Sequence, residues 1–91
     1  MAITIRLSSL LSAYSGGAGE FSLSATSVRE ALETLERQHP NLHRSICDET
    51  GAVRRHVNVF VNSRNMRDLN GLDTLLTDGN IVTILQAVSG G

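Results

Sequence analysis

Residues 81–88, IVTILQAV, constrain the fold more than any other segment of this 91-residue sequence. Apolar side chains fall on both faces of the strand that these residues would form. A strand that is apolar on both faces belongs in the middle of a sheet, where each face can be covered. The segment therefore predicts a central strand near the end of the chain.

Three further segments, residues 3–7, 20–24 and 55–62, alternate between apolar and polar side chains, as strands with one buried face do. The stretch SAYSGGAG at residues 12–19 predicts a flexible loop that joins the first two strands as a hairpin. This loop lacks the Gly-Lys-Ser/Thr continuation of a phosphate-binding loop and precedes a strand rather than a helix. We therefore do not expect it to bind phosphate.

One amphipathic helix is predicted between Val28 and Gln38, because apolar residues recur there at spacings of three and four. Ser27 and Glu30 match a capping box at its start. Pro40 cannot continue a helix and disfavours helical angles in the residue before it, so the helix is expected to end near Gln38. The apolar stripe consists of Val28, Ala31, Leu32 and Leu35.

The remaining segments carry weaker signals. Residues 41–52 have few periodic apolar positions, and we expect an irregular connection there with room for one helical turn. A turn is expected at residues 62–65, followed by a short strand that begins at Met66. Residues 72–76 are expected to form a brief helical turn, and the sequence Thr-Asp-Gly at 77–79 predicts a turn before the last strand.

The order of these elements predicts an α+β fold of the β-grasp type. We expect a mixed sheet of four to five strands, with the last strand parallel to the first and one main helix packed on one face. Residues 1–86 are predicted to form a single β-grasp domain, and residues 87–91, AVSGG, a flexible C-terminal tail. The tail would then leave from a strand held in the interior of the sheet.

Composition argues against several classes of function. Hydrophobic residues make up 41% and charged residues 19% of the chain, with a net charge of −1, so we expect neither a nucleic-acid nor a membrane partner. No apolar run approaches the roughly 20 residues that cross a bilayer, and the opening MAITIRL is too short for a signal peptide. Cys47 is the only cysteine, which fits a reducing compartment, and we expect a cytoplasmic protein.

The sequence contains three further candidate sites. His39, His43 and Cys47 are spaced by four and have metal-binding side chains, but Pro40 interrupts the helix that would align them, so no metal site is predicted. Arg54 and Arg55 form a basic pair that we expect to be exposed to solvent at the start of a strand. Phe60 projects from an otherwise polar strand face, where it either fills a minor core or presents a partner surface. No catalytic residue is predicted.

The last residues suggest the chemistry. Gly90 and Gly91 have no Cβ, so their backbone can enter a slot that is too narrow for any other residue. Residues 87–91 reach about 17 Å when extended, far enough to carry the Gly91 carboxyl into a neighbour's active site. That carboxyl, with a pKa of about 3.5, is a poor electrophile until ATP activates it as an acyl-adenylate. Two terminal glycines alone also fit a disordered end or a cloning remnant.

In this setting the segment HVNVFVN, the Asp78-Gly79 turn and VTILQAVSGG resemble the ubiquitin-like sulfur carriers of the MoaD and ThiS families. The resemblance spans nearly the whole chain and is greatest to the CysO-type branch. It implies a ubiquitin-like β-grasp that acts as a protein co-substrate and not as an enzyme. Gly90 and Gly91 match the family's diglycine, and the residues expected to thread into a partner's active site are Ala87, Val88, Ser89 and Gly90.

The resemblance also implies the partners. An activating enzyme of the MoeB/ThiF type would adenylate Gly91, and a sulfur donor would convert it to a thiocarboxylate. In the CysO-type branch a pyridoxal-phosphate cysteine synthase then accepts the sulfur, and a JAMM-type metalloprotease releases the cysteine. ATP, pyridoxal phosphate and zinc would thus belong to partners, and this chain is expected to bind no cofactor.

Several alternatives stay open at this point. The sulfur could serve the synthesis of cysteine, or of a siderophore or other secondary metabolite. The chain could instead be a molybdopterin synthase small subunit, or a ubiquitin-like modifier conjugated to proteins through Gly91. It contains no lysine, which fits both a carrier that avoids self-acylation and a modifier that forms no chains. The final acceptor, the oligomeric state and any precursor residues beyond Gly91 are not determined by the sequence.

Overall fold

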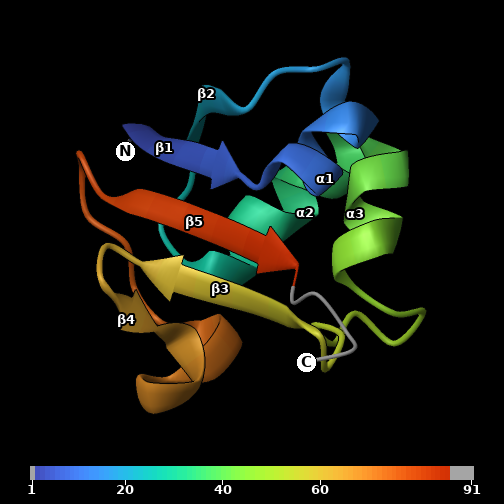
Figure 1. Ribbon diagram of the computed structural model, residues 1–91. Helices are drawn as coiled ribbons and strands as arrows, with labels where there is room; N and C mark the ends of the chain where they lie inside the picture. Colours follow the sequence, from blue (N-terminus) through green and yellow to red (C-terminus); the bar gives the residue numbers. More distant parts are fainter. Residues whose placement is uncertain (1, 87–91) are drawn as a thin grey trace.

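A five-stranded mixed sheet with helices packed on it forms the architecture, in a computed structural model that describes residues 2–86 (Figure 1). The strand order is β2-β1-β5-β3-β4, which confirms the predicted α+β class and the central position of the last strand. The strands are β1 (Ala2–Leu7), β2 (Glu20–Ser24), β3 (Val57–Val61), β4 (Arg64–Asn65) and β5 (Ile81–Gln86).

Strand β5 is hydrogen-bonded on both sides. It runs parallel to β1, with Val82 opposite Ile5, and antiparallel to β3, with Ile84 opposite Val59. The parallel pairing of the first and last strands and the β1–β2 hairpin pairing are confirmed. Strand β1 pairs with β5 as far as Ile84 and β3 pairs with it as far as Gln86, so β3 fixes the position of the end of β5 in the sheet.

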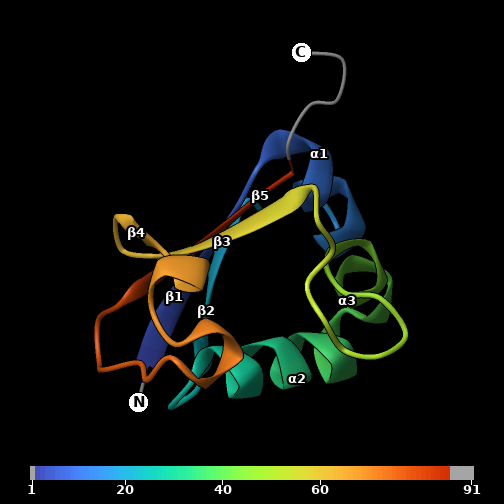
Figure 2. The same cartoon turned by 90° about the horizontal axis from the view of Figure 1, so that it is seen from below.

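The two faces of β5 differ in burial. Val82 and Ile84 are fully buried under the helices, whereas Ile81 is half-buried and Leu85 is 39% exposed on the other face. The helices lie on one side of the sheet only (Figure 2). The central position of β5 was thus correctly predicted, but its second apolar face is not covered by a helix. We call this side of the sheet the open face.

Helix α2 (Val28–Gln38) has the predicted bounds. The Ser27 hydroxyl accepts a hydrogen bond from the Glu30 amide at 3.1 Å, and the Glu30 carboxylate accepts one from the amide of Thr26 at 3.0 Å. Both bonds satisfy amides at the helix start that have no partner within the helix. The apolar stripe of this helix faces the sheet and is buried.

The connection predicted to be irregular, with room for one helical turn, contains a further helix, α3 (Pro40–Ile46). Pro40 ends α2 but occupies the first turn of α3, where its missing N–H costs nothing and its fixed φ suits the helix. Leu42 and Ile46, four residues apart, are both fully buried. The predicted main helix, α2, is confirmed, and α3 packs beside it in the same helical layer.

The loop predicted at residues 12–19 is shorter than expected. Helix α1 (Ser9–Ser12) and a 3-10 turn (Ala13–Ser15) precede it, because Leu11 is drawn into the core and is fully buried. The hydroxyl of Ser15 lies within hydrogen-bonding distance of the carbonyl oxygens of Ser12, at 2.9 Å, and Ala18, at 2.7 Å. These contacts leave only residues 16–19 as an irregular loop.

A short strand, β4, is present near the predicted position, but it lies earlier in the chain. It ends at Asn65, whereas the predicted strand begins at Met66. Met66 starts a 3-10 turn (Met66–Asp68) because Asn65 caps that turn, its side-chain oxygen accepting from the Arg67 amide at 2.9 Å. A second 3-10 turn (Gly71–Asp73) lies near the predicted helical turn. The turn before β5 is confirmed, with Gly79 at a φ of 87° that favours glycine.

The hydrophobic core lies between the sheet and the helical layer. No helix within residues 2–86 is long and apolar enough to cross a membrane. The predicted tail, residues 87–91, lies outside the described residues. The fully buried core side chains with the largest volumes are Ile3, Ile5, Leu11, Leu35, Leu42, Ile46 and Ile84.

Candidate functional site

The predicted site begins where β5 ends. Gln86, the last described residue, is the cross-strand partner of Val57, the first residue of β3. We call this pair the tail anchor. The residues predicted to carry the acyl group and to thread into a partner lie outside the described residues: Gly91, Gly90, Ser89, Val88 and Ala87.

The open face leads up to the tail anchor. Thr83 pairs with Phe60 on one side and with Arg6 on the other, so these three side chains share a face of the sheet. Phe60 is half-buried and belongs neither to the core nor to the residues packed against it. Ile81 and Leu85 lie on the same face of β5. Phe60 therefore lies with two other apolar side chains on the open face, and its role as a partner surface stays a prediction.

A tight turn precedes the tail anchor on the β3 side. The Val57 amide donates to the Arg54 carbonyl at 3.0 Å, which closes a turn over residues 54–57. Arg54 is also bonded to α3, since its amide donates to the Ile46 carbonyl at 2.9 Å and its Nε to the Arg44 carbonyl at 3.1 Å. We call residues 54–57 the basic turn.

Arg67 holds the basic turn from the other side. Its Nη2 donates to the carbonyl oxygens of Arg54 at 3.2 Å and Val57 at 3.0 Å, and its Nη1 to the side-chain oxygen of Asn58 at 3.0 Å. The guanidinium fork is rigid, so these bonds fix the carbonyls relative to one another. The first residue of β3, and with it the tail anchor, is therefore held by more than sheet hydrogen bonds.

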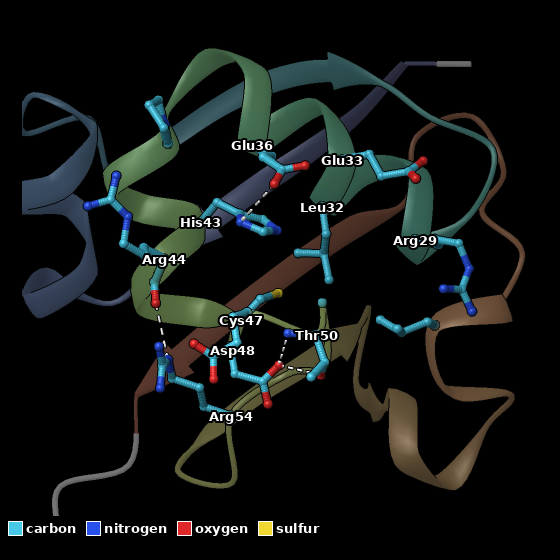
Figure 3. Close-up of a pocket in the computed structure, with 14 residues that line it drawn as sticks. Arg29, Leu32, Glu33, Glu36, His43, Arg44, Cys47, Asp48, Thr50 and Arg54 are labelled. Carbon is cyan, nitrogen blue, oxygen red and sulfur yellow. Dashed lines mark hydrogen bonds and ion pairs between the residues drawn. The ribbon is translucent and has the colours of Figure 1, made fainter.

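A cavity of about 760 Å³ lies in the helical layer between α2, α3 and the segment that follows α3 (Figure 3). Leu32 and Cys47 point into it, and three arginines and four acidic residues surround it, so its charge is mixed. Within it, His43 Nδ1 lies 4.0 Å from the Glu36 carboxylate. The charged residues that line it are Arg29, Arg44, Arg54, Glu33, Glu36, Asp48 and Glu49.

Cys47 is the buried thiol of this cavity. Burial, together with the nearby negative charges of Asp48 and Glu36, raises its pKa to about 11, and the positive charge of Arg54 opposes the rise. The thiolate is the nucleophilic form of cysteine, so this thiol is inert at neutral pH. The cavity therefore supplies no activated nucleophile.

Asp48 is bound up in the local structure beside the cavity. Its carboxylate accepts hydrogen bonds from the Thr50 hydroxyl at 2.6 Å, the Thr50 amide at 2.8 Å and the Ala52 amide at 3.2 Å. These bonds, the Thr50 hydroxyl first, lower the pKa of Asp48 because they favour the charged form. Asp48 thus shapes the turn after α3 rather than offering a free carboxylate.

The three residues weighed as metal ligands are not brought together. His39 lies between α2 and α3 with non-helical angles, and its ring packs against Phe21 with centroids 5.3 Å apart. His43 and Cys47 line the cavity. Within residues 2–86, no three histidine, cysteine or acidic side chains lie close enough to hold a metal ion.

Comparison with known proteins decides the family. The profile of the ThiS family matches residues 12–91, which include β2 to β5, the basic turn and the diglycine. The chain belongs to the ThiS family. The resemblance inferred from the sequence is thereby confirmed.

Relatives of this ThiS-family chain include carriers and modifiers. The sulfur carrier protein CysO of Mycobacterium tuberculosis (strain ATCC 25618 / H37Rv) is 32% identical over 93 residues, which cover all of both chains. The small archaeal modifier protein 3 of Haloferax volcanii is 36% identical over 64 residues, which cover 70% of this chain and 68% of that protein. Both have sequences similar to this chain, over different lengths.

Solved structures show the same fold. A chain in the crystal structure of the Amycolatopsis orientalis BexX/CysO complex has a TM-score of 0.88 and 29% identity, covering 98% of this chain and 99% of that chain. The small archaeal modifier protein 1 of Methanosarcina acetivorans has a TM-score of 0.85 and 32% identity, covering 99% of this chain and 96% of that chain. These likenesses confirm the ubiquitin-like β-grasp of this ThiS-family chain.

Sequence reasoning missed the basic turn and the role of Arg67. The sequence predicts a solvated strand entrance at Arg54 and Arg55, and Arg55 is exposed, but Arg54 is half-buried and hydrogen-bonded to α3. Arg67 gave no signal, since its acceptors lie 9 to 13 residues away along the chain. The alternation of residues 55–62 could have placed the turn at the entrance of β3, but not beside the tail.

Proposed function

We propose that this chain is a sulfur carrier whose C-terminal glycine, Gly91, is converted to a thiocarboxylate by partner enzymes. The observation that carries the proposal is the identity of 32% with the sulfur carrier protein CysO over the whole of both chains, within the ThiS family. The geometry supports it, because the tail anchor fixes the point from which residues 87–91 continue. Those residues reach about 17 Å when extended.

The proposed chemistry takes place at the Gly91 carboxylate. Attack of this carboxylate on the α-phosphorus of ATP forms an acyl-adenylate and releases pyrophosphate. A sulfide-equivalent nucleophile then attacks the acyl carbon, and AMP leaves as the carbon–sulfur bond forms. The carboxylate is ionised at neutral pH and unreactive, so the phosphoanhydride supplies the driving force. This chain is the acyl donor, and it acts as a co-substrate rather than as an enzyme.

Partners would supply all other groups in this scheme. A MoeB/ThiF-type enzyme would bind ATP and adenylate Gly91, and a sulfur donor would follow. A cysteine-synthase-like enzyme with pyridoxal phosphate, or another sulfur-accepting enzyme, would take the sulfur, and a JAMM-type zinc protease would release a product. The Amycolatopsis orientalis structure is a complex of BexX with CysO, which supports partner docking by carriers of this kind. The open face with Phe60 is the surface that we propose for docking.

The test is carrier-dependent exchange of labelled pyrophosphate into ATP by the activating enzyme of the same organism. Wild-type protein is expected to support exchange. Deletion of Gly91 is expected to abolish it, because the shortened tail ends about 3.4 Å before the reacting position. Exchange that is equal with and without Gly91 would overturn the proposal, since it would not involve the tail carboxyl.

A second candidate is a protein modifier joined to lysines of target proteins through Gly91. It is favoured by the identity of 36% with the small archaeal modifier protein 3 of Haloferax volcanii. Both candidates require adenylation, so they separate only at the acceptor. Target lysines joined through an isopeptide bond to the C-terminal peptide that ends in Gly91 would support the modifier, and their absence alongside a thiocarboxylate would support the carrier.

A further inference from the structure

Positive charge is concentrated in one segment of this nearly neutral chain. Four of the eight basic residues lie between residues 51 and 67, and none of the nine acidic residues does. The net charge of the whole chain is −1, whereas the net charge of residues 51–67 is positive. The four are Arg54, Arg55, Arg64 and Arg67.

Arg55 and Arg64 lie near opposite ends of β3. The basic turn, with Arg55 at its tip, ends at Val57 and is therefore joined directly to the tail anchor. Arg64 pairs with Val61 at the opposite end of the strand. Four residue steps along a strand separate the two ends by about 13 Å. Arg55 thus lies at the end of the sheet from which the tail continues. Arg64 is an exposed arginine at the opposite end of β3 and serves as a matched control for Arg55.

The tip of the basic turn is exposed but rigidly supported. Arg55 and His56 are exposed, while the turn is held by the bonds of Arg54 to α3 and of Arg67 to the Arg54 and Val57 carbonyls. Among the carboxylates of residues 2–86, none forms an ion pair with Arg55. A charge presented by a fixed backbone costs less ordering entropy on binding than one on a mobile loop.

We propose that Arg55 docks against an acidic surface of the enzyme that adenylates the tail, an inference that rests on the proposed function. Residues 87–91 span about 17 Å, so an active site that reaches Gly91 brings the enzyme's surface over the tail anchor and the adjacent turn. If the enzyme covered Arg55 without placing a negative charge next to it, the guanidinium would lose its hydration and gain no ion pair in return. The enzyme surface that meets Arg55 therefore carries carboxylates, and these also steer the encounter.

The experiment compares Arg55→Glu with Arg64→Glu in the pyrophosphate-exchange assay, using the purified activating enzyme of the same organism. At about 50 mM salt we expect kcat/KM for the carrier to fall about tenfold in Arg55→Glu, with kcat at saturating carrier unchanged, because a rim charge acts on association. Arg64→Glu is expected to stay within about twofold of wild type, and Arg55→Lys to keep most of the activity. Thermal melting checks that each variant is folded.

Salt gives a second arm to the experiment. The difference between Arg55→Glu and wild type is expected to shrink severalfold near 1 M salt, where the Debye length is about 3 Å instead of about 10 Å at 0.1 M. Equal kcat/KM for the two charge reversals, or a loss in Arg55→Glu that salt does not change, would overturn the inference. Absence of exchange with folded wild-type protein would instead overturn the proposed function, and the inference with it.

Discussion

The guanidinium of Arg67 donates a hydrogen bond to the carbonyl oxygen of Val57 at 3.0 Å, and Val57 is the cross-strand partner of Gln86. The side chain of Arg67, in the 3-10 turn after β4, thus holds Val57, the residue that pairs with Gln86 at the end of β5. This relationship links the basic turn to the predicted carrier tail. It also leads directly to a stability prediction.

Replacing Arg67 with alanine is expected to lower the free energy of unfolding by about 1 kcal/mol, because bonds to three acceptors are lost from an exposed side chain. Amide exchange at Val57, whose N–H bonds the Arg54 carbonyl, is expected to accelerate. Urea unfolding and hydrogen-exchange NMR measure the two effects. Arg64→Ala is the control, and an equal effect of both variants would contradict the support assigned to Arg67.

Replacing Leu42 with alanine tests helix α3, which is longer than the single helical turn that the sequence allows for. Leu42 is fully buried in α3, so the loss of its side chain should leave a cavity and cost about 3 kcal/mol of unfolding free energy. Leu10→Ala is the matched control, since Leu10 is 58% exposed and should cost less than about 0.5 kcal/mol. Urea titration distinguishes them, and similar midpoints for both variants would show that α3 does not pack as described.

The thiol of Cys47 predicts a pH dependence of stability. Its pKa is raised from 9.0 to about 11 in the folded state, first by burial and then by Asp48 and Glu36. The resulting stabilisation is present in full below pH 9.0 and is lost as the pH rises to about 11, because only the unfolded chain releases the proton there. The free energy of unfolding should fall more steeply over this range in wild type than in Cys47→Ala. Parallel pH profiles would contradict the raised pKa.

Replacing Gly90 with valine is expected to lower kcat/KM for adenylation by about 100-fold or more, because a β-branched side chain cannot enter a slot shaped for bare backbone. The described core lies within residues 3–84, so thermal stability should be unchanged. Ser89→Ala serves as the control and should retain activity. Normal adenylation of folded Gly90→Val would show that the tail is not threaded through a narrow slot.

Much of the fold followed from periodicity. The alternation of β3, the stripe of α2 and its capping box are local patterns, and the structure contains all three. The strand predicted over residues 55–62 is shorter, because residues 54–57 form a turn and β3 spans only Val57–Val61. The central position of β5 followed from its apolar composition, although the open face shows that Ile81 and Leu85 are not buried under a helix. These elements were predictable because the side chains that define them are close in sequence.

The corrections came from tertiary contacts. Helix α1 and its 3-10 turn exist because Leu11 reaches the core, and α3 exists because Pro40 both ends one helix and begins the next. The basic turn depends on strand pairing and on Arg67, which no local pattern indicates. Conversely, the diglycine was visible in the sequence alone, while the structure describes only the strand that precedes the tail.

The most direct test of the central claim is the intact mass of the protein after incubation with its activating enzyme, ATP and a sulfide source. Replacement of the Gly91 carboxylate oxygen by sulfur adds about 16 Da, and we expect this gain in wild type. Deletion of Gly91 should abolish it. A wild-type mass that stays unchanged under conditions in which the enzyme turns over ATP would contradict the assignment of this chain as a sulfur carrier.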